Sequence, residues 1–397
     1  MSASDDSAKK KKPDFLVFSD DWGEHPSSCQ HIFRHIAKNH RVLWVNTIGM
    51  RNPTLSWTDV RKVFVKVSKM FGRKRTPTAA EVDANVTVCQ PLMLPGSRSR
   101  AVRAFNAHSV TRKVSAMTRS LGMADPIVVT TVPNASEYPE LLKDRKVVYY
   151  CVDDFSLWPG FEADVVLQME SRLIERADYL IAASKNLSER ISMAGKFSHL
   201  LTHGVDYEMF STPATSELPA LKGIPKPRVG FFGLIDGRMD WDLVTSVAKQ
   251  MQNISFVFAG PVDASTINIP QTDNIYFVGP VSYALIPQFI AGLKVLLLPY
   301  RTGNLAEALS PLKLKEYLAT QLPIISAPIS EARALGDSLF ISGTRAEWVN
   351  TLSGILRGEM RVKSHESSRQ LLVGESWHSK AEAFRSLCVN SENISDA

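Results

Sequence analysis

Short apolar segments alternate with longer segments of mixed polarity along most of the chain. Several short segments are apolar at nearly every position, whereas a strand with one solvent-facing side would alternate. Continuous apolar runs of this length are typical of parallel strands that helices cover on both faces. In the first half we expect strands at residues 15–19, 42–45, 86–89, 127–131, 147–151 and 179–182. The pattern between them predicts helices at residues 27–38, 100–121, 161–177 and 185–193.

A second series of the same kind begins near residue 229. Its predicted strands are residues 229–232, 254–259, 275–278, 295–298, 324–327 and 339–341. Its predicted helices are residues 240–252, 282–291, 312–320 and 345–356. Two successive runs of β-α alternation indicate two doubly wound α/β domains. The length of 397 residues agrees, because it suits two domains of roughly 200 residues better than one core.

The domain boundary is expected at residues 211–228, a stretch with four prolines that suits a linker. The predicted N-terminal domain is residues 14–210, and the predicted C-terminal domain is residues 229–375. A disordered basic tail is expected at residues 1–13, which include four consecutive lysines. Residues 376–397 are predicted to form an amphipathic helix and a tail.

Composition places the chain among soluble globular proteins, since it is 44% hydrophobic and 22% charged. The longest apolar runs have the length of strands, and no apolar signal segment follows the N-terminal lysines. The four cysteines are scattered, so neither a structural zinc site nor a disulfide framework is indicated. A cytoplasmic protein is therefore expected.

Positive charge is concentrated in residues 51–113, which carry 13 lysines and arginines against 3 acidic residues. Within this region, residues 59–73 place five apolar side chains on one helical face and basic side chains on much of the rest. Such a helix suits an anionic membrane surface or a lipid phosphate. The residues expected to contact the membrane are Arg61, Lys62, Phe64, Lys66, Lys69 and Phe71. The alternative is a surface helix packed on its own domain. Nucleic acid is not expected, because no aromatic-interleaved basic sheet accompanies the charge.

The clearest candidate for chemistry follows the predicted strand that ends before Tyr300. After a polar loop, Ser310 and Pro311 form a strong helix-start signal. The exposed amides of a first helical turn bind anions, whereas Lys313 in that turn would oppose the helix dipole. A bound diphosphate would remove that conflict, and Glu316, one turn on, could accept hydrogen bonds from ribose hydroxyls. The alternative is an ordinary capped helix with a Lys–Glu surface pair.

Carboxylates also follow two predicted strands of the first half, at the sheet edge where ligands of α/β proteins bind. Asp153 and Asp154 follow residues 147–151, and either is a candidate general base or a cap of the next turn. Asp20, Trp22 and His25 follow the first strand and are candidates for acceptor binding.

Two further segments are expected to contribute to a ligand site in the second half. The strand at residues 229–232 runs into a glycine-bearing loop with Gly233 and Arg238, a weak form of a phosphate-binding turn. Asp240-Trp-Asp242 has the spacing of a metal motif, but its place at a helix start indicates capping, so no metal ligand is expected.

Several of these segments, in this order, resemble GT-B glycosyltransferases related to family 4, and bacterial exopolysaccharide and teichuronic-acid enzymes such as xanthan glucuronosyltransferase look most similar. The segments are VVYYCVDDFSLW (147–158), ESRLIERADYLIAAS (170–184), LTHGVDYEMF (201–210), VGFFGLIDGRMDWDLV (229–244), LLLPY (296–300) and SPLKLKEYLA (310–319). The resemblance implies two Rossmann-like domains with a cleft between them and a C-terminal helix that crosses back to the first domain.

The resemblance also implies roles for individual residues. Lys313 and the helix start at Ser310, Pro311 and Leu312 would bind the donor diphosphate, and Glu316 would bind its ribose. His203, Gly233, Arg238 and Tyr300 would complete the donor site. Asp153 is at the place of the catalytic base in xanthan glucuronosyltransferase.

One position departs from the family pattern. Many members carry two glutamates eight positions apart, whereas this chain has Ala308 at the first of the two positions. A retaining mechanism that depends on that glutamate is therefore not predicted, and inversion with Asp153 as base is the alternative.

The expected function is a metal-independent, hexosyltransferase-type reaction, in polysaccharide or glycolipid synthesis. The donor would be a nucleoside-diphosphate sugar, with UDP favoured and GDP possible, and the acceptor a saccharide or lipid-linked saccharide. No further cofactor is expected. The enzyme would lie on the inner face of the cell membrane as a peripheral protein. Three alternatives stay open: a non-catalytic nucleotide-sugar-binding subunit, a nucleotide-sugar epimerase and, less favoured because the chain is short, a phosphorylase.

Overall fold

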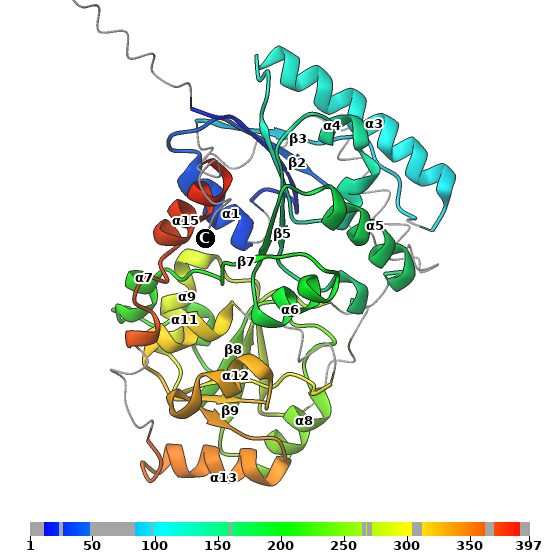
Figure 1. Ribbon diagram of the computed structural model, residues 1–397. Helices are drawn as coiled ribbons and strands as arrows, with labels where there is room; N and C mark the ends of the chain where they lie inside the picture. The colour runs from blue at the N-terminus through cyan, green and yellow to red at the C-terminus, as the bar shows by residue number, and fades with distance from the viewer. Residues whose placement is uncertain are drawn as a thin grey trace, which may run out of the picture. The chain divides into compact units, whose positions relative to one another are not determined.

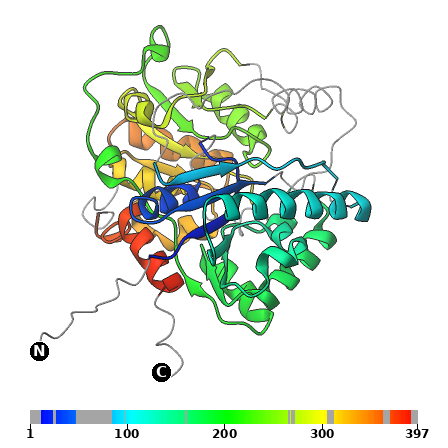
Figure 2. The same ribbon diagram turned by 90° about the horizontal axis from the view of Figure 1, so that it is seen from above.

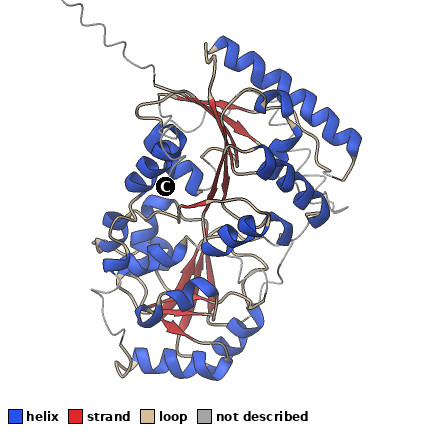
Figure 3. Ribbon diagram, viewed as in Figure 1, coloured by secondary structure: helices blue, strands red, loops and turns tan. Residues whose placement is uncertain are grey.

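The chain forms two compact units, each built on a parallel β-sheet (Figures 1 and 3). A computed structural model describes residues 12–23, 27–47, 84–96, 98–158, 161–263, 267, 272–303, 312–361 and 369–389. Unit 1 comprises Met1–Thr202 and Trp377–Ala397, and unit 2 comprises His203–Ser376. Among the described residues, no helix is both long and apolar enough to cross a lipid bilayer.

The sheet of unit 1 has the strand order β3-β2-β1-β4-β5-β6-β7, and all its pairings are parallel. The strands are β1 (Phe15–Ser19), β2 (Val42–Asn46), β3 (Val86–Cys89), β4 (Ile127–Thr130), β5 (Val147–Cys151), β6 (Tyr179–Ala182) and β7 (His199–Leu200). Every residue of β1, β2, β4 and β5 is buried, as the continuous apolar runs predicted. The six strands expected in this half are confirmed to within one residue, and β7 is an addition.

Helices cover the sheet of unit 1, and Figure 2 shows α3 as the long cyan helix of this unit. The α-helices are α1 (Ser28–Ile36), α3 (Arg100–Ser120), α4 (Pro139–Leu142), α5 (Ala163–Arg176), α6 (Lys185–Met193) and α15 (Trp377–Val389), and the 3₁₀ helices are η1 (Pro133–Glu137) and η2 (Phe155–Leu157). Helix α15 packs on α1, where the rings of Trp377 and His31 stack with centroids 4.4 Å apart. The predicted return of the C-terminal helix to the first domain is therefore confirmed.

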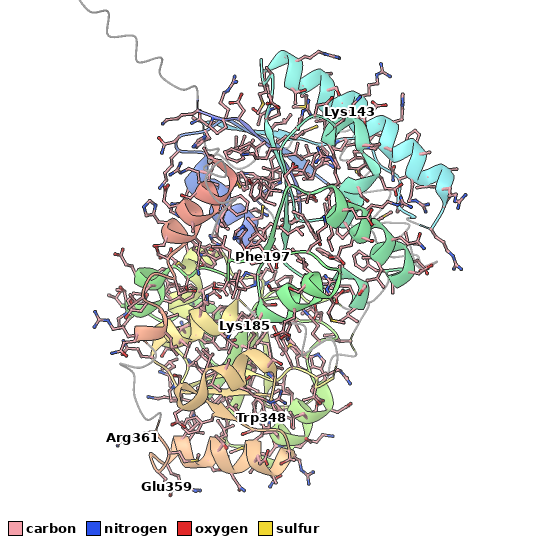
Figure 4. All side chains as sticks on the ribbon, viewed as in Figure 1. Lys143, Lys185, Phe197, Trp348, Glu359 and Arg361 are labelled. Carbon is pink, nitrogen blue, oxygen red and sulfur yellow. The ribbon has the colours of Figure 1, made fainter. Side chains whose placement is uncertain are left out.

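The sheet of unit 2 has the order β10-β9-β8-β11-β12-β13, also with parallel pairings. Its strands are β8 (Arg228–Phe232), β9 (Ser255–Ala259), β10 (Ile275–Gly279), β11 (Val295–Leu298), β12 (Ile324–Ser326) and β13 (Phe340–Ile341). Its α-helices are α7 (Tyr207–Ser211), α8 (Trp241–Gln250), α9 (Ile286–Ala291), α11 (Lys313–Thr320), α12 (Ser330–Ala334) and α13 (Arg345–Leu356). The 3₁₀ helices are η3 (Pro219–Leu221), η4 (Tyr283–Leu285) and η5 (Gly336–Ser338). Helix α13 is anchored by buried Trp348, whose indole N–H donates to the carbonyl of Ser342 at 2.7 Å (Figure 4).

The division between the units differs from the predicted linker at residues 211–228, because the chain passes from unit 1 to unit 2 at His203. The proline-bearing stretch is part of unit 2. The Leu218 N–H donates to the carbonyl of Gln288 at 2.9 Å, and Leu221 is fully buried in the core of the unit. Apolar side chains between the prolines therefore bind this stretch to the core, which composition alone does not reveal.

Candidate functional site

Strand β8 ends in a glycine turn that lies directly under the Lys313 side chain. Gly233 has a φ of +128°, a backbone conformation that residues other than glycine rarely adopt. A Cβ atom built on Gly233 would lie 2.1 Å from Cε of Lys313 and 2.6 Å from its Nζ. The Lys313 ammonium also lies 5.5 Å from the ring centroid of Phe231, within the range of a cation–π contact. The absence of a side chain at residue 233 therefore makes room for a cation beside a backbone turn.

Helix α11 begins at Lys313, and its N-cap residue, Leu312, offers no side-chain hydrogen bond to the first turn. The amides of a first helical turn carry partial positive charge and favour an anion. Lys313 adds a full positive charge at the same end. Ser310 and Pro311, which the sequence predicts at this helix start, lie outside the described residues, as does Ala308. The described part of α11 thus favours an anionic ligand.

One turn into α11, Glu316 is buried, with 4% of its surface exposed, and accepts a hydrogen bond from the Tyr283 hydroxyl at 3.1 Å. Burial raises the pKa of Glu316 to about 7, Asp206 contributes in the same direction, and Lys313 and the Tyr283 hydrogen bond oppose the rise. A carboxyl group with this pKa changes charge near neutral pH. Tyr283, in η4, was not among the residues singled out from the sequence, because no pattern marks it.

The turn that begins unit 2 packs against the same helix. Asp206 caps α7 by accepting the N–H of Met209 at 3.4 Å, and α7 packs on α11. Phe210 of α7 contacts the ring of Tyr283 edge-on, with centroids 5.7 Å apart. The His203 carbonyl accepts a hydrogen bond from Lys315 of α11. The structure therefore brings His203 and Asp206 to the helix that carries Lys313 and Glu316, and a donor-binding role for His203 stays a prediction.

Arg238 and Tyr300 lie together at the ends of neighbouring strands of unit 2. The Arg238 guanidinium pairs with the carboxylate of Asp236 through Nε, at 2.9 Å and 3.0 Å, and through Nη2, at 2.9 Å. It also lies 6.0 Å from the ring centroid of Tyr300, which is buried. A bidentate contact of Arg238 with a diphosphate stays a prediction.

Asp153 and Asp154 follow β5 in unit 1 and have different environments. The Asp154 side chain caps η2, since it accepts the Ser156 N–H at 3.1 Å and the Ser156 hydroxyl at 2.5 Å. The Asp153 carboxylate accepts the N–H of Asp154 at 3.0 Å, and its side chain is half-buried. The capping alternative thus applies to Asp154, and Asp153 stays the candidate base.

A buried ion pair that the sequence did not indicate lies beside this turn. Arg190 of α6 contacts Glu170 of α5 at 2.5 Å and 2.8 Å, and its Nε lies 3.6 Å from the Asp154 carboxylate. Glu170 also accepts the Tyr149 hydroxyl at 2.6 Å. Burial raises the pKa of the neighbouring Cys151 thiol to about 12, so this cysteine is not a nucleophile at neutral pH. This network of Arg190, Glu170 and Tyr149 holds the backbone turn that carries Asp153.

Asp20 and Trp22 lie after β1 and are held by other side chains of unit 1. The Asp20 carboxylate accepts hydrogen bonds from the side chains of Ser19 at 2.7 Å, Ser27 at 3.0 Å and Gln30 at 2.9 Å. Trp22 contacts the ring of Trp44, with centroids 4.7 Å apart. An acceptor-binding role for Asp20 and Trp22 stays a prediction, and His25 lies outside the described residues.

The structure also bears on the predicted metal and membrane features. Asp240 accepts the N–H of Leu243 at 3.0 Å and is the N-cap of α8, as expected, while the side chain of Asp242 is 95% exposed. Among the described residues, no group of three or more His, Cys, Asp or Glu side chains is placed to hold a metal ion. The predicted membrane-contact residues Arg61, Lys62, Phe64, Lys66, Lys69 and Phe71 lie outside the described residues.

Comparison with known proteins gives one sequence relative and many similar structures. No family model matches the chain. Over 218 residues the chain is 27% identical to TuaH of Bacillus subtilis (strain 168), which carries a provisional name as a teichuronic acid biosynthesis glycosyltransferase. This match covers 49% of the chain and 53% of TuaH, so it spans about half the length of that curated relative.

Solved structures are similar over nearly the whole chain. Sucrose-phosphate synthase from Thermosynechococcus elongatus superposes with a TM-score of 0.68 at 13% identity, covering 96% of this chain and all of that one. HepE from Anabaena, in complex with UDP, superposes with a TM-score of 0.59 at 14% identity, covering 94% of this chain and 98% of HepE. The chain therefore has the fold of the GT-B glycosyltransferases, as its sequence predicted.

Proposed function

We propose that the protein is a glycosyltransferase that transfers a sugar from a nucleoside-diphosphate sugar to a saccharide or lipid-linked acceptor. The observation that carries the proposal is the arrangement of Gly233, Lys313 and Glu316, which places a cation, helix amides and a buried carboxylate within one turn of α11. The fold supports it, and so does the provisional name of TuaH. HepE was solved with UDP and with UDP-glucose, so a UDP-sugar is the proposed donor.

We propose that different residues of unit 2 bind the diphosphate and the ribose of the nucleotide. Lys313 and the backbone amides at the start of α11 bind the diphosphate, and Glu316 accepts hydrogen bonds from the ribose hydroxyls. His203, Arg238, Tyr300, Ser310 and Pro311 complete the site. These cationic and amide groups stabilise the charge that develops on the departing diphosphate without requiring a metal ion.

On the acceptor side, we propose Asp153 as the general base. Its carboxylate takes the proton of the attacking acceptor hydroxyl while the acceptor oxygen bonds to the anomeric carbon of the sugar. The bond from that carbon to the diphosphate breaks, and the nucleoside diphosphate leaves with the electron pair. One displacement of this kind inverts the anomeric configuration. Asp20, Trp22 and His25 are the proposed acceptor-binding residues.

The third part of the proposal is peripheral contact with an anionic membrane on its cytoplasmic side, where a lipid-linked acceptor would be available. Positive charge in unit 1 supports it. Residues 84–124 contain six lysines and arginines and no aspartate or glutamate. On α3, the side chains of Arg100, Arg112 and Arg119 are exposed. Such a surface attracts anionic headgroups, with a strength that falls as salt is added.

Calorimetry with UDP and GDP in the presence of EDTA tests the donor site. UDP is expected to bind the wild type and to bind Lys313→Ala at least about tenfold more weakly, as for loss of a charge-assisted hydrogen bond. Lys249→Ala, at an exposed lysine of α8, is the matched control and should bind as the wild type does. If no nucleotide binds the wild type, the proposal is wrong. Donor binding without transfer to any acceptor would instead indicate a non-catalytic subunit, and donor turnover without an acceptor would indicate an epimerase.

A further inference from the structure

Lys315 of α11 connects the donor helix to both ends of unit 2. Its Nζ donates to the main-chain carbonyl of His203, the first residue of the unit, and pairs with the carboxylate of Glu375, next to the last residue. The side chains are 23% exposed for Lys315 and 21% exposed for Glu375, so both charges are largely shielded from water. Because the ammonium has two acceptors at once, it is held in one place.

The two chain segments that Lys315 joins are also paired with each other. The Val205 N–H donates to the Glu375 carbonyl at 2.8 Å, and Val205 and Ser376 form a parallel β-bridge. The first and last segments of unit 2 therefore pair with each other as two short parallel segments of backbone. Lys315 connects these paired segments to α11, because it donates to His203 at the beginning of the unit and to Glu375 at the end.

Lys315 is two residues after Lys313 and one before Glu316, on the same helix. Residues two apart on an α-helix point to different sides, so Lys315 does not share the face of Lys313. Lys315 donates one hydrogen bond to a backbone oxygen and one to a protein carboxylate. A ligand could bind this ammonium only if these bonds were broken. These positions separate the role of Lys315 from that of a donor ligand.

We infer that Lys315, with Glu375, is a positioning residue that holds the His203 turn against α11, at the distance from Lys313 that binding of a diphosphate requires. This inference rests on the proposed donor site. A helix is rigid over three residues, so the place of His203 relative to Lys313 depends on the contacts that join the turn to the helix. Without the Lys315 bonds, α7 would still pack on α11, but the backbone at His203 would lose its hydrogen bond to the helix, and its ordering when the nucleotide binds would weaken affinity.

The test compares the binding of UDP and of uridine, which keeps the base and ribose but lacks the diphosphate. Lys315→Met removes both bonds and keeps most of the apolar stem, and it should weaken UDP binding about tenfold, the size of the cost of ordering one more segment on binding. Uridine binding should change less than about twofold. Lys315→Arg, which keeps the positive charge and the N–H donors, should restore most of the UDP affinity, and Glu375→Gln should give an intermediate loss. Lys249→Met is the matched control.

Each result decides between this role and its alternatives. Wild-type affinity for UDP in Lys315→Met would overturn the inference while leaving the donor site intact. Equal losses for UDP and uridine, together with a lower melting temperature, would show that Lys315 only stabilises the unit, and would also overturn it. Should the wild type bind no UDP, the proposed function itself would fail, which the same titration reveals before any variant is made.

Discussion

Tyr283 donates its hydroxyl hydrogen to Oε1 of Glu316 at 3.1 Å, across 33 residues of sequence. The carboxyl group that accepts this bond is buried, and burial raises its pKa to about 7. Because a hydrogen bond to the charged form favours ionisation, Tyr283 keeps Glu316 closer to the charge state that accepts hydrogen bonds from a ribose. Tyr283, which the sequence analysis did not single out, thereby offsets part of the rise that burial causes in the pKa of Glu316.

The first prediction concerns the pH dependence of nucleotide binding. If the ionised form of Glu316 binds the ribose, UDP affinity should rise with pH through about 7 in the wild type. Tyr283→Phe removes a bond that lowers the pKa of Glu316, so the midpoint of this rise should move to higher pH. Calorimetric titration between about pH 6 and pH 9 measures both midpoints, because this range extends above and below the raised pKa of Glu316. An unchanged midpoint in Tyr283→Phe would contradict the role of the hydrogen bond.

The second prediction is that Glu316→Gln stabilises the protein at alkaline pH. The folded-state pKa of Glu316 is raised, so its contribution to stability is present below the unfolded-state pKa and is lost as pH rises through about 7. Compared with the wild type, Glu316→Gln should gain up to about 3 kcal/mol at pH 8 and almost nothing near pH 4. Urea unfolding at both pH values measures this difference. UDP affinity should fall in the same variant, since an amide replaces the carboxylate. A stability gain that is equal at both pH values would exclude this explanation.

The third prediction separates the steric and the backbone roles of Gly233. Gly233→Ala places a Cβ atom against Lys313 and should weaken UDP binding at least about tenfold, the effect of losing one charge-assisted hydrogen bond. Gly279→Ala is the matched control, because Gly279 also has a positive φ, of +77°, but no atom within 4 Å of the added Cβ. Both variants should lose about 1 kcal/mol of stability or more, and only the first should lose affinity. Equal affinities in the two would show that the contact with Lys313 is unimportant.

A fourth prediction distinguishes the two aspartates after β5. Asp153→Asn should reduce the transfer rate by about 100-fold or more, with UDP affinity and melting temperature near those of the wild type. Asp154→Ala removes the cap of η2 and should lower stability by about 1 kcal/mol. Single-turnover transfer, calorimetry and thermal unfolding measure the three quantities. Full transfer activity in Asp153→Asn would remove this residue as the base.

The buried ion pair beneath that turn supports a fifth prediction. Glu170→Gln removes the nearer of the two carboxylates beside the Arg190 guanidinium and should destabilise the protein by about 3 kcal/mol in urea unfolding. The exposed pair of Arg357 and Glu359 is the matched control, and Glu359→Gln should cost less than about 1 kcal/mol. Similar effects of the two substitutions would mean that the burial of Glu170 has no energetic consequence.

The strands were predicted closely because the signal for a buried parallel strand is local. Each of the expected strands is a run of mostly apolar residues, and the structure moves their ends by one residue at most. Strand β7 (His199–Leu200) and the short helices α7 and α12 were not predicted, because two to five residues carry no measurable periodicity. Their formation depends on pairing and packing with distant parts of the chain.

Helix α11 could be singled out from the sequence as the candidate donor helix because Lys313 and Glu316 are neighbours on one turn. The partners that set their properties could not, since Tyr283 is 33 residues from Glu316 and Glu375 is 60 residues from Lys315. The same holds for the boundary between the units, where buried leucines bind the proline-bearing stretch to unit 2. Sequence separation of this size leaves no spacing rule from which a contact could be inferred.

By itself, the sequence determined the features that arise within a few residues: the alternation of strands and helices, the N-cap of α8 at Asp240 and the basic, anion-favouring start of α11. Only the tertiary structure decided the burial, the pKa values and the contacts of the residues in those features. It buried Glu316 and so raised its pKa, placed Lys313 over Gly233, and joined Lys315 to both ends of unit 2. The physical reason is that capping and periodicity are properties of adjacent residues, whereas burial and charge pairing depend on which distant segments the fold brings together.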